Sequence, residues 1–141
     1  MREVSTTIEI ARAPAEVYAY ATDPRHFAEW QRDVVAVQMR GEQEFATVRR
    51  FAGARRTITQ QITRAEPPHA WAARGTDGPI RPHATVTVEP IHHGAGSRVT
   101  FALGFEGHGI GVALLPLVRE QARKLAPRSY ENLRRLLEGI E

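Results

Sequence analysis

Two glutamines interrupt apolar patterns, and they are the polar residues whose positions most favour contact with a bound molecule. Gln60 stands between Ile58 and Ile62 on the apolar side of an alternating segment. Gln121 stands among leucines in the last, helix-like segment. Because a polar group on a buried face needs a hydrogen-bond partner, Gln60 must find one in a ligand, a water molecule or Gln121.

The histidines are the residues best suited to acid–base or metal chemistry. His92 and His93 are adjacent, so on a strand they would point to opposite sides. His83 shares the parity of Thr85 and belongs to an outer sheet face. Since the chain has no Cys and no His-Glu-x-x-His pattern, we expect no metal site. We favour His108, which precedes the final helix near an expected cavity entrance.

Four arginines surround a predicted hairpin turn at residues 51–54: Arg49, Arg50, Arg55 and Arg56. They form either a solvated hairpin end or a rim that attracts anions. Neighbouring strand residues face opposite sides, so only one of Arg49 and Arg50 points inward. A shift of one residue in the register reverses the choice, which the sequence leaves open.

Other common chemistries are absent from the pattern. No Ser-His-Asp arrangement, phosphate-binding glycine loop or dinucleotide fingerprint is present, so we expect no cofactor. The net charge of +3 and the pI of 9.9 come from scattered arginines, with Lys124 the sole lysine. Without a basic stripe interleaved with aromatics, we expect no nucleic-acid partner. No apolar run approaches ~18 residues and no signal peptide begins the chain, so we expect a cytoplasmic protein without a membrane-spanning segment.

Apolar periodicity predicts the elements that position these residues. Residues 4–10 alternate as a half-buried strand, and Pro14 and Pro24 each begin a short helix, the second capped by Asp23. Period-two alternation between turn signals then predicts six further strands. These strands fall around residues 35–40, 45–52, 54–64, 71–75, 84–89 and 99–105.

The last thirty residues change to the spacing of one face of a long α-helix. The predicted inner face is Ile110, Leu114, Leu117, Gln121, Leu125, Ser129, Leu133, Leu136 and Ile140. Pro127 lies inside this segment and cannot donate to the carbonyl of Arg123. We therefore predict a kink or a break at Pro127.

Strands joined by short turns pair antiparallel, and one half-buried sheet face needs a cover. Only the C-terminal helix is long enough to provide it. The sequence therefore predicts one α+β domain over residues 1–141. Its curved, seven-stranded antiparallel sheet wraps around the long C-terminal helix, with two short helices between the first two strands.

Four local motifs in this order resemble the START/polyketide-cyclase superfamily, often called SRPBCC, which has the helix-grip fold. They are IARAPAEVY at residues 10–18, TDPRHFAEW at 22–30, GSRVT at 96–100 and YENLRRLLE at 130–138. The resemblance covers essentially the whole chain. It implies a deep cavity between sheet and helix, with Trp30 near its mouth. It also implies that members bind lipids, sterols, polyketides or plant hormones, and that a cavity arginine polarises a carbonyl in aromatase-type members.

We therefore expect a domain, monomeric or homodimeric, that binds a small hydrophobic molecule in this cavity. The alternatives are a polyketide cyclase or dehydratase whose catalytic residues the sequence does not identify, and a domain whose helix groove docks another protein. The predicted ligand-binding residues are Trp30, Gln60, Trp71, Phe101, Phe105, His108, Leu114, Leu117, Gln121 and Leu125.

Overall fold

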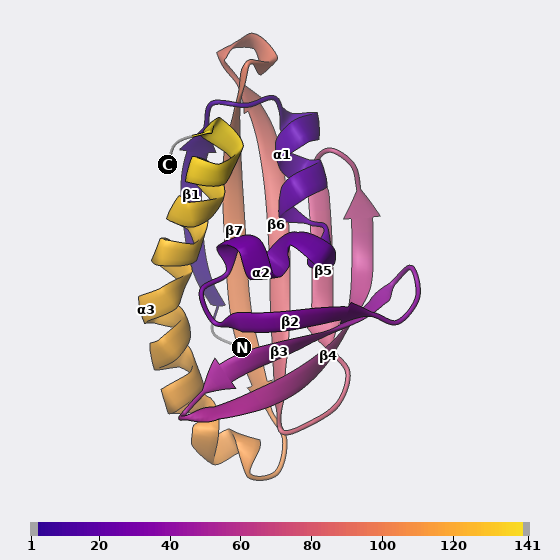
Figure 1. Ribbon diagram of the computed structural model, residues 1–141, viewed down its shortest axis with the longest axis vertical. Coiled ribbons are helices and arrows are strands. Elements are labelled where there is room, and N and C mark those ends of the chain that lie inside the picture. Colours follow the sequence, from indigo (N-terminus) through magenta and orange to yellow (C-terminus); the bar gives the residue numbers. More distant parts are fainter. Residues whose placement is uncertain (1–2, 140–141) are drawn as a thin grey trace.

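The computed structural model, which describes residues 3–139, is one antiparallel sheet with all its α-helices on one side (Figure 1). Within those residues the seven strands are β1 (Glu3–Ile10), β2 (Val34–Met39), β3 (Glu44–Phe51), β4 (Ala54–Glu66), β5 (Ala70–Gly75), β6 (Ile80–Ile91) and β7 (Gly96–Gly107). The α-helices are α1 (Pro14–Ala21), α2 (Phe27–Trp30) and α3 (Gly111–Glu138). The predicted α+β helix-grip architecture is confirmed, and Ile140 lies outside the described residues.

Successive strands from β2 to β7 pair as a meander, and β1 closes the free side of β7, giving the order β1-β7-β6-β5-β4-β3-β2. The register brings Phe45, Gln60 and Gly75 together across three neighbouring strands. Because side chains alternate along each strand, these three positions share the concave face. Val86 and Phe101 pair on the same face of β6 and β7.

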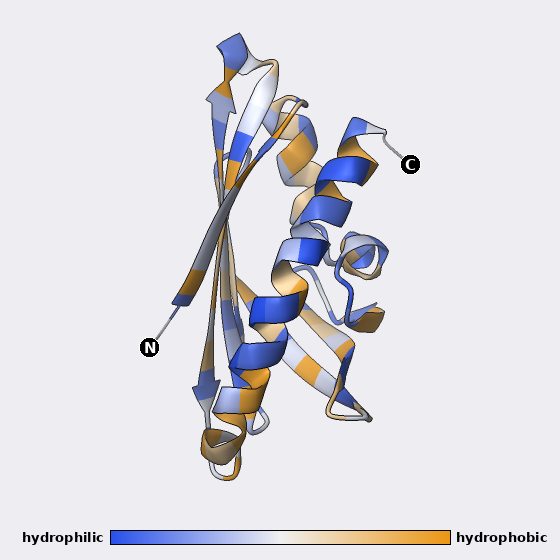
Figure 2. Cartoon of the chain, turned by 90° about the vertical axis from the view of Figure 1, so that its left-hand side faces the viewer, coloured by the Kyte–Doolittle hydropathy of each residue, from blue (hydrophilic) through white to orange (hydrophobic). Residues whose placement is uncertain are grey.

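Two irregularities accompany the bending of the sheet. The register shifts between Val34 and Ala36 on β2, and between Ile62 and Arg64 on β4. A β-bulge, in which one strand carries an extra residue opposite its partner, shifts the register in this way, bends the strand and increases its local twist. In Figure 2 the half of the sheet that holds β2, β3 and β4 turns away from the rest and toward α3.

Helices α1, α2 and α3 cover the concave face through apolar side chains that the alternation of the sequence predicts. Phe45, Val17, Val99 and Leu133 are fully buried in this layer. Polar contacts also fix the short helical segments. The Asp23 carboxylate accepts the backbone N–H of Arg25 at 3.0 Å and caps the 3₁₀ turn Pro24–His26, which leads into α2. The hydroxyl of Tyr18 donates to the carbonyl of Ala70 at 2.9 Å and holds α1 on β5.

Helix α3 departs from its predicted form in two respects. It continues past Pro127 to Glu138, so of the kink or break predicted at Pro127 the break does not occur. Its buried face also differs from the predicted stripe, because Leu117 and Leu136 are exposed while Val118 and Tyr130 are buried. The stripe favoured large alkyl side chains such as Leu117, whereas the helix turns the smaller Ala122 and Ala126 toward the cavity.

Replacing Pro127 by Ala is expected to raise the free energy of unfolding by about 1–2 kcal/mol. Alanine restores the N–H that can donate to the Arg123 carbonyl, and an interior proline costs about 3 kcal/mol relative to alanine. The gain is smaller than that because proline also restricts the unfolded chain by up to about 1 kcal/mol.

Urea denaturation followed by circular dichroism measures this change. Pro14→Ala is the matched control, since Pro14 occupies the first position of α1 and its missing N–H has no intrahelical role. An unchanged or lower midpoint for Pro127→Ala would show that the proline fits α3 without cost.

Candidate functional site: a cavity under the long helix

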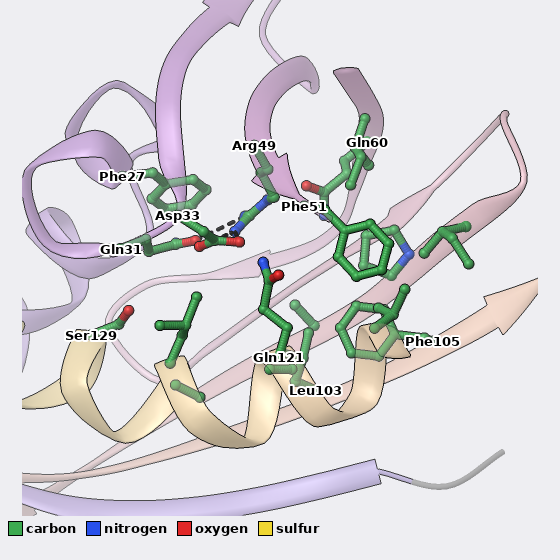
Figure 3. Close-up of a pocket in the computed structure, with 18 of the residues that line it drawn as sticks. Phe27, Gln31, Asp33, Arg49, Phe51, Gln60, Leu103, Phe105, Gln121 and Ser129 are labelled. Carbon is green, nitrogen blue, oxygen red and sulfur yellow. Dashed lines mark hydrogen bonds and ion pairs between the residues drawn. The ribbon is translucent and has the colours of Figure 1, made fainter. Parts of the chain in front are cut away.

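A cavity of about 250 Å³ lies between the concave face of the sheet and α3, with α2 at one end (Figure 3). Its walls are mainly apolar and rich in aromatic rings. The aromatic residues that line it are Phe27, Trp30, Phe51, Trp71, Phe101, Phe105 and Tyr130. Strands β3, β5 and β7 and helices α2 and α3 supply these rings, so the cavity depends on elements from most of the chain.

The aromatic rings hold one another in fixed positions. The rings of Phe101 and Tyr130 are stacked, with centroids 4.1 Å apart and planes 10° from parallel. Trp30 contacts the same pair, with its centroid 6.0 Å from that of Phe101 and 6.4 Å from that of Tyr130. Such contacts stabilise the wall beyond simple burial. A wall of flat rings favours a flat, apolar guest.

The structure brings together eight of the ten predicted site residues around this cavity. They are Trp30, Gln60, Trp71, Phe101, Phe105, Leu114, Gln121 and Leu125. Trp30 is only 4% exposed. It therefore lies deep in the cavity wall, and its expected place at the mouth was wrong.

Leu117 and His108 do not line the cavity. Leu117 is 58% exposed, because α3 is rotated so that Leu114 and Val118 face inward instead. His108 turns outward, and its Nε2 lies 2.6 Å from Oε1 of Glu106. His83 approaches the other carboxylate oxygen of Glu106 at 3.1 Å, on the outer face that its parity predicts. These two contacts lower the pKa of the Glu106 carboxyl.

The arginine left open by the sequence is Arg49, which lines the cavity, while the side chain of Arg50 is exposed. Register pairs Arg49 with Arg56 on the concave face. The guanidinium of Arg49 donates from Nη1 to Asp33 at 3.1 Å and from Nη2 to Gln31 at 2.8 Å. A guanidinium has five N–H donors, so Arg49 keeps capacity for a further acceptor in the cavity.

Tyr130 is a functional candidate that the helical stripe missed. Its ring is buried and lines the cavity. Burial raises the pKa of its hydroxyl to about 12, although the nearby positive charge of Arg49 opposes the shift. The phenol is therefore protonated at neutral pH. The signal that could have found it is the spacing of Ala122, Ala126 and Tyr130 at steps of four residues.

Gln60 lies on the cavity wall with 4% exposure, and its Oε1 has no hydrogen-bond partner among the described residues. Gln121 does not supply that partner, because its Nε2 donates to the backbone carbonyl of Arg50 at 2.8 Å. Figure 3 shows both amides on opposite walls of the cavity. A buried carbonyl without a partner costs about 1–3 kcal/mol. Gln60 therefore lowers the stability of the folded protein unless a bound molecule forms a hydrogen bond with its amide.

The mouth of the cavity is marked by lining residues that are also exposed. Those that face the concave side come from the beginning of β4, at Arg56, and from the β5–β6 loop, at Asp77, Gly78 and Pro79. The segment between β7 and α3 lies against this loop, since the backbone N–H of His108 donates to the Pro79 carbonyl at 2.8 Å. Trp30 and α2 lie away from this mouth, in the interior.

Within residues 3–139, no group of three or more His, Cys, Asp or Glu side chains is arranged to hold a metal ion. In the same range, no helix combines the length and apolar character needed to cross a bilayer.

The sequence matches the family described as "Polyketide cyclase / dehydrase and lipid transport" over residues 1–138. The chain therefore belongs to this family, which confirms the resemblance drawn from its four motifs. No curated protein matches the sequence.

Solved structures of START-like proteins share this fold. The Zhui aromatase/cyclase from Streptomyces sp. R1128 superposes with a TM-score of 0.83 at 13% identity, over 97% of this chain and 93% of that one. A protein of Thermus thermophilus gives 0.80 at 17% identity, over 96% and 97%. A START superfamily protein from Mycobacterium smegmatis gives 0.73 at 14% identity, over 97% and 94%. At these identities the likeness establishes the fold alone.

Replacing Gln60 by Leu is expected to raise the free energy of unfolding of the ligand-free protein by about 1–2 kcal/mol. The change removes a buried carbonyl for which the described part of the chain offers no partner, and fills the same space with hydrocarbon. Gln61→Leu is the matched control on the exposed face of β4, where we expect a change within about 0.5 kcal/mol. Equal midpoints in urea for the two variants would contradict this account.

Alkaline pH is expected to destabilise the protein partly through Tyr130. The folded pKa of about 12 exceeds the ordinary value of 10.0, so folding favours the protonated phenol. This contribution is complete below pH 10 and is lost as the pH rises through 12. At about pH 11 the loss from Tyr130 is about 1 kcal/mol.

Urea unfolding of the wild type and of Tyr130→Phe at about pH 9 and about pH 11 measures that loss. Both proteins keep the contributions of Tyr18 and Tyr20, whose pKa values are also raised by burial. The fall in stability should therefore be smaller in Tyr130→Phe. An identical fall in both proteins would mean that Tyr130 ionises freely in the folded state.

Proposed function

We propose that this protein binds a small, flat and mainly apolar molecule that carries one polar group, such as a hydroxyl or a carbonyl. The observation that carries the proposal is the aromatic-lined cavity of about 250 Å³ with the buried amide of Gln60 in its wall. Native interiors are densely packed, so a cavity that remains open between well-packed walls favours a ligand site.

The size of the cavity limits the ligand. A cavity of about 150 Å³ lined by apolar side chains accommodates benzene. The space of about 250 Å³ under α3 therefore suits roughly two fused rings, with any longer substituent leaving through the mouth. At about 0.6 kcal/mol per heavy atom, a ligand of about eleven heavy atoms gains about 7 kcal/mol, which gives a Kd of the order of 10 μM.

The polar side chains of the cavity provide two sets of hydrogen-bonding groups for a ligand. Arg49 and Tyr130 offer donors near α2 and β3, suited to a carbonyl or phenolate oxygen. The amide of Gln60 can present either its oxygen or its nitrogen, so it suits a hydroxyl. Few polar groups among many apolar ones orient a ligand without holding it by charge, which fits an aromatic alcohol or ketone better than a sugar or a nucleotide.

Titration with 2-naphthol, followed by intrinsic fluorescence, tests the proposal. The chain has two tryptophans, Trp30 and Trp71, and both line the cavity, so an occupant should quench or shift their emission. We expect saturable binding with a Kd of the order of 10 μM, and naphthalene should bind about tenfold more weakly because it offers no hydroxyl. In Gln60→Leu the preference for 2-naphthol should fall.

A cavity-filling variant provides the control for specific binding. Ala84 lines the cavity on β6, whereas Ala72 on β5 faces the outer side of the sheet. Ala84→Phe should weaken 2-naphthol binding at least tenfold, and Ala72→Phe should not. Equal affinities for the two variants, or no saturable binding by the wild type, would refute the proposal.

Catalysis on such a ligand is the second candidate, and it is supported by Tyr130 and Arg49, which both line the cavity. A phenol with a pKa near 12 can donate a proton to a departing or developing oxyanion, and a guanidinium can stabilise the negative charge. Cyclisation or dehydration of a poly-ketone chain needs both roles. Conversion of a linear poly-β-ketone to an aromatic product by the wild type would distinguish this candidate from simple binding.

A further inference from the structure

The first two turns of α3 expose apolar side chains that nothing in the described chain covers. Ile110 is 75% exposed, Val112 is 60% exposed and Leu117 is 58% exposed, and we call these three residues the helix tip. No charged or hydrogen-bonding side chain occurs between Gly109 and Val118. Figure 2 shows this apolar segment at the lower end of α3, in contrast to the mainly hydrophilic outer face of the rest of the helix. A helix that is apolar all round normally has a partner on every side.

The helix tip stands beside the cavity mouth. Gly111, between Ile110 and Val112, packs directly on the β5–β6 loop, where an added Cβ would lie 1.8 Å from the carbonyl oxygen of Pro79. Pro79 belongs to the exposed part of the cavity lining. Leu114, one turn further on, lines the cavity itself. The exposed apolar residues and the entrance therefore face the same end of the molecule.

Positive charge lies on the other side of the mouth. Arg50, Arg55 and Arg56 at the turn between β3 and β4 are exposed, and we call them the arginine hairpin. This hairpin reaches α3, because Gln121 donates to the Arg50 carbonyl at 2.8 Å. Figure 1 shows the end of the hairpin against the lower half of α3. The carboxylates at this end of the molecule include Asp77 on the rim, Glu106 just before the helix tip and Glu120 on α3. Glu106 contacts His83 and His108, and Glu120 is paired with Arg123.

We propose that the helix tip and the arginine hairpin together dock this protein on an anionic phospholipid surface, with the cavity mouth turned toward the bilayer. Apolar side chains enter the boundary between headgroups and acyl chains, while arginines contact the phosphates. Docking itself does not depend on the proposed ligand. The role of docking rests on the proposed function, since a hydrophobic ligand could then pass between bilayer and cavity without crossing water.

A lipid surface fits this patch better than a second copy of the chain. The three side chains of the helix tip project from one end of a helix and form no groove. They offer far less area than the ~800 Å² that each partner buries in a standard interface. Two copies joined here would also bring two arginine hairpins together. A membrane needs neither shape complementarity nor a large area, and its negative charge matches the hairpin.

Co-sedimentation of the purified protein with vesicles tests the proposal without any ligand. We expect binding to vesicles of phosphatidylcholine with about a third phosphatidylglycerol, and at least fivefold weaker binding to phosphatidylcholine alone. Raising the salt to about 0.5 M should remove most of this difference. Ile110→Ser with Val112→Ser should weaken binding to both vesicle types at least tenfold. Serine is tolerated at the start of a helix, so this variant should fold.

Three controls complete the experiment. Leu136→Ser removes an exposed leucine from the far end of α3 and should leave sedimentation unchanged. Arg50→Gln with Arg55→Gln should weaken binding about tenfold on the anionic vesicles only. The Ile110→Ser, Val112→Ser variant should bind 2-naphthol like the wild type, which separates failed docking from a failed cavity.

Two results would overturn the proposal. The first is equal sedimentation of the wild type and the Ile110→Ser, Val112→Ser variant with anionic vesicles, or none for the wild type. The second is a dimer, measured by light scattering after gel filtration, that this variant dissociates. A dimer of that kind would mean that a second copy covers the helix tip.

Discussion

The bent sheet and its single long cover impose the constraint on which the rest of the structure depends. The concave face is apolar along β5, β6 and β7, and α3 is the element that can shield its full length from water. A straight helix cannot follow a curved surface at every point. Close contacts hold α3 at Gly111, which packs on the β5–β6 loop, and at Ser129, which accepts the backbone N–H of Arg32, and the cavity lies between those points. The cavity is the space that this mismatch leaves, and stacked rings such as those of Phe101 and Tyr130 keep it from collapsing.

Strand periodicity allowed most of this arrangement to be predicted, because alternation fixes which side chains share a sheet face. Gln60, Trp71 and Phe101 could be assigned to the concave face once the strands were recognised, and the register places them there. The inward arginine could not be chosen, because a one-residue shift exchanges Arg49 and Arg50. The hydrogen-bonded pairing of β3 with β4 places Arg49 on the concave face. This register depends on contacts between strands and not on the local sequence pattern.

Helix α3 was harder to predict, for a different physical reason. A hydrophobic stripe assumes that the largest alkyl side chains are buried, which holds when a helix packs on a flat, filled core. Here the helix lies over a cavity, so its inner face includes the small side chains of Ala122 and Ala126, and the ring of Tyr130 closes the wall. The leucine at position 117 is left outside. The exposure of Leu117 and the burial of Tyr130 both follow from the rotation of α3 about its axis relative to the predicted stripe.

Two features of this protein, the buried Gln60 amide whose oxygen has no partner in the described chain and the exposed apolar end of α3, each carry a free-energy cost. Folding alone does not explain either feature. We expect the protein to be more stable with leucine at position 60 and more soluble with serine at position 110. The packed core of Phe45, Val17 and Leu133 supplies the stability that tolerates both. Their positions are also related, because the amide lies inside the cavity and the helix end lies beside its mouth. A molecule that enters past Ile110 and reaches Gln60 would relieve the cost of the amide, and a surface that covers the helix tip would relieve the cost of the exposed side chains along the same route.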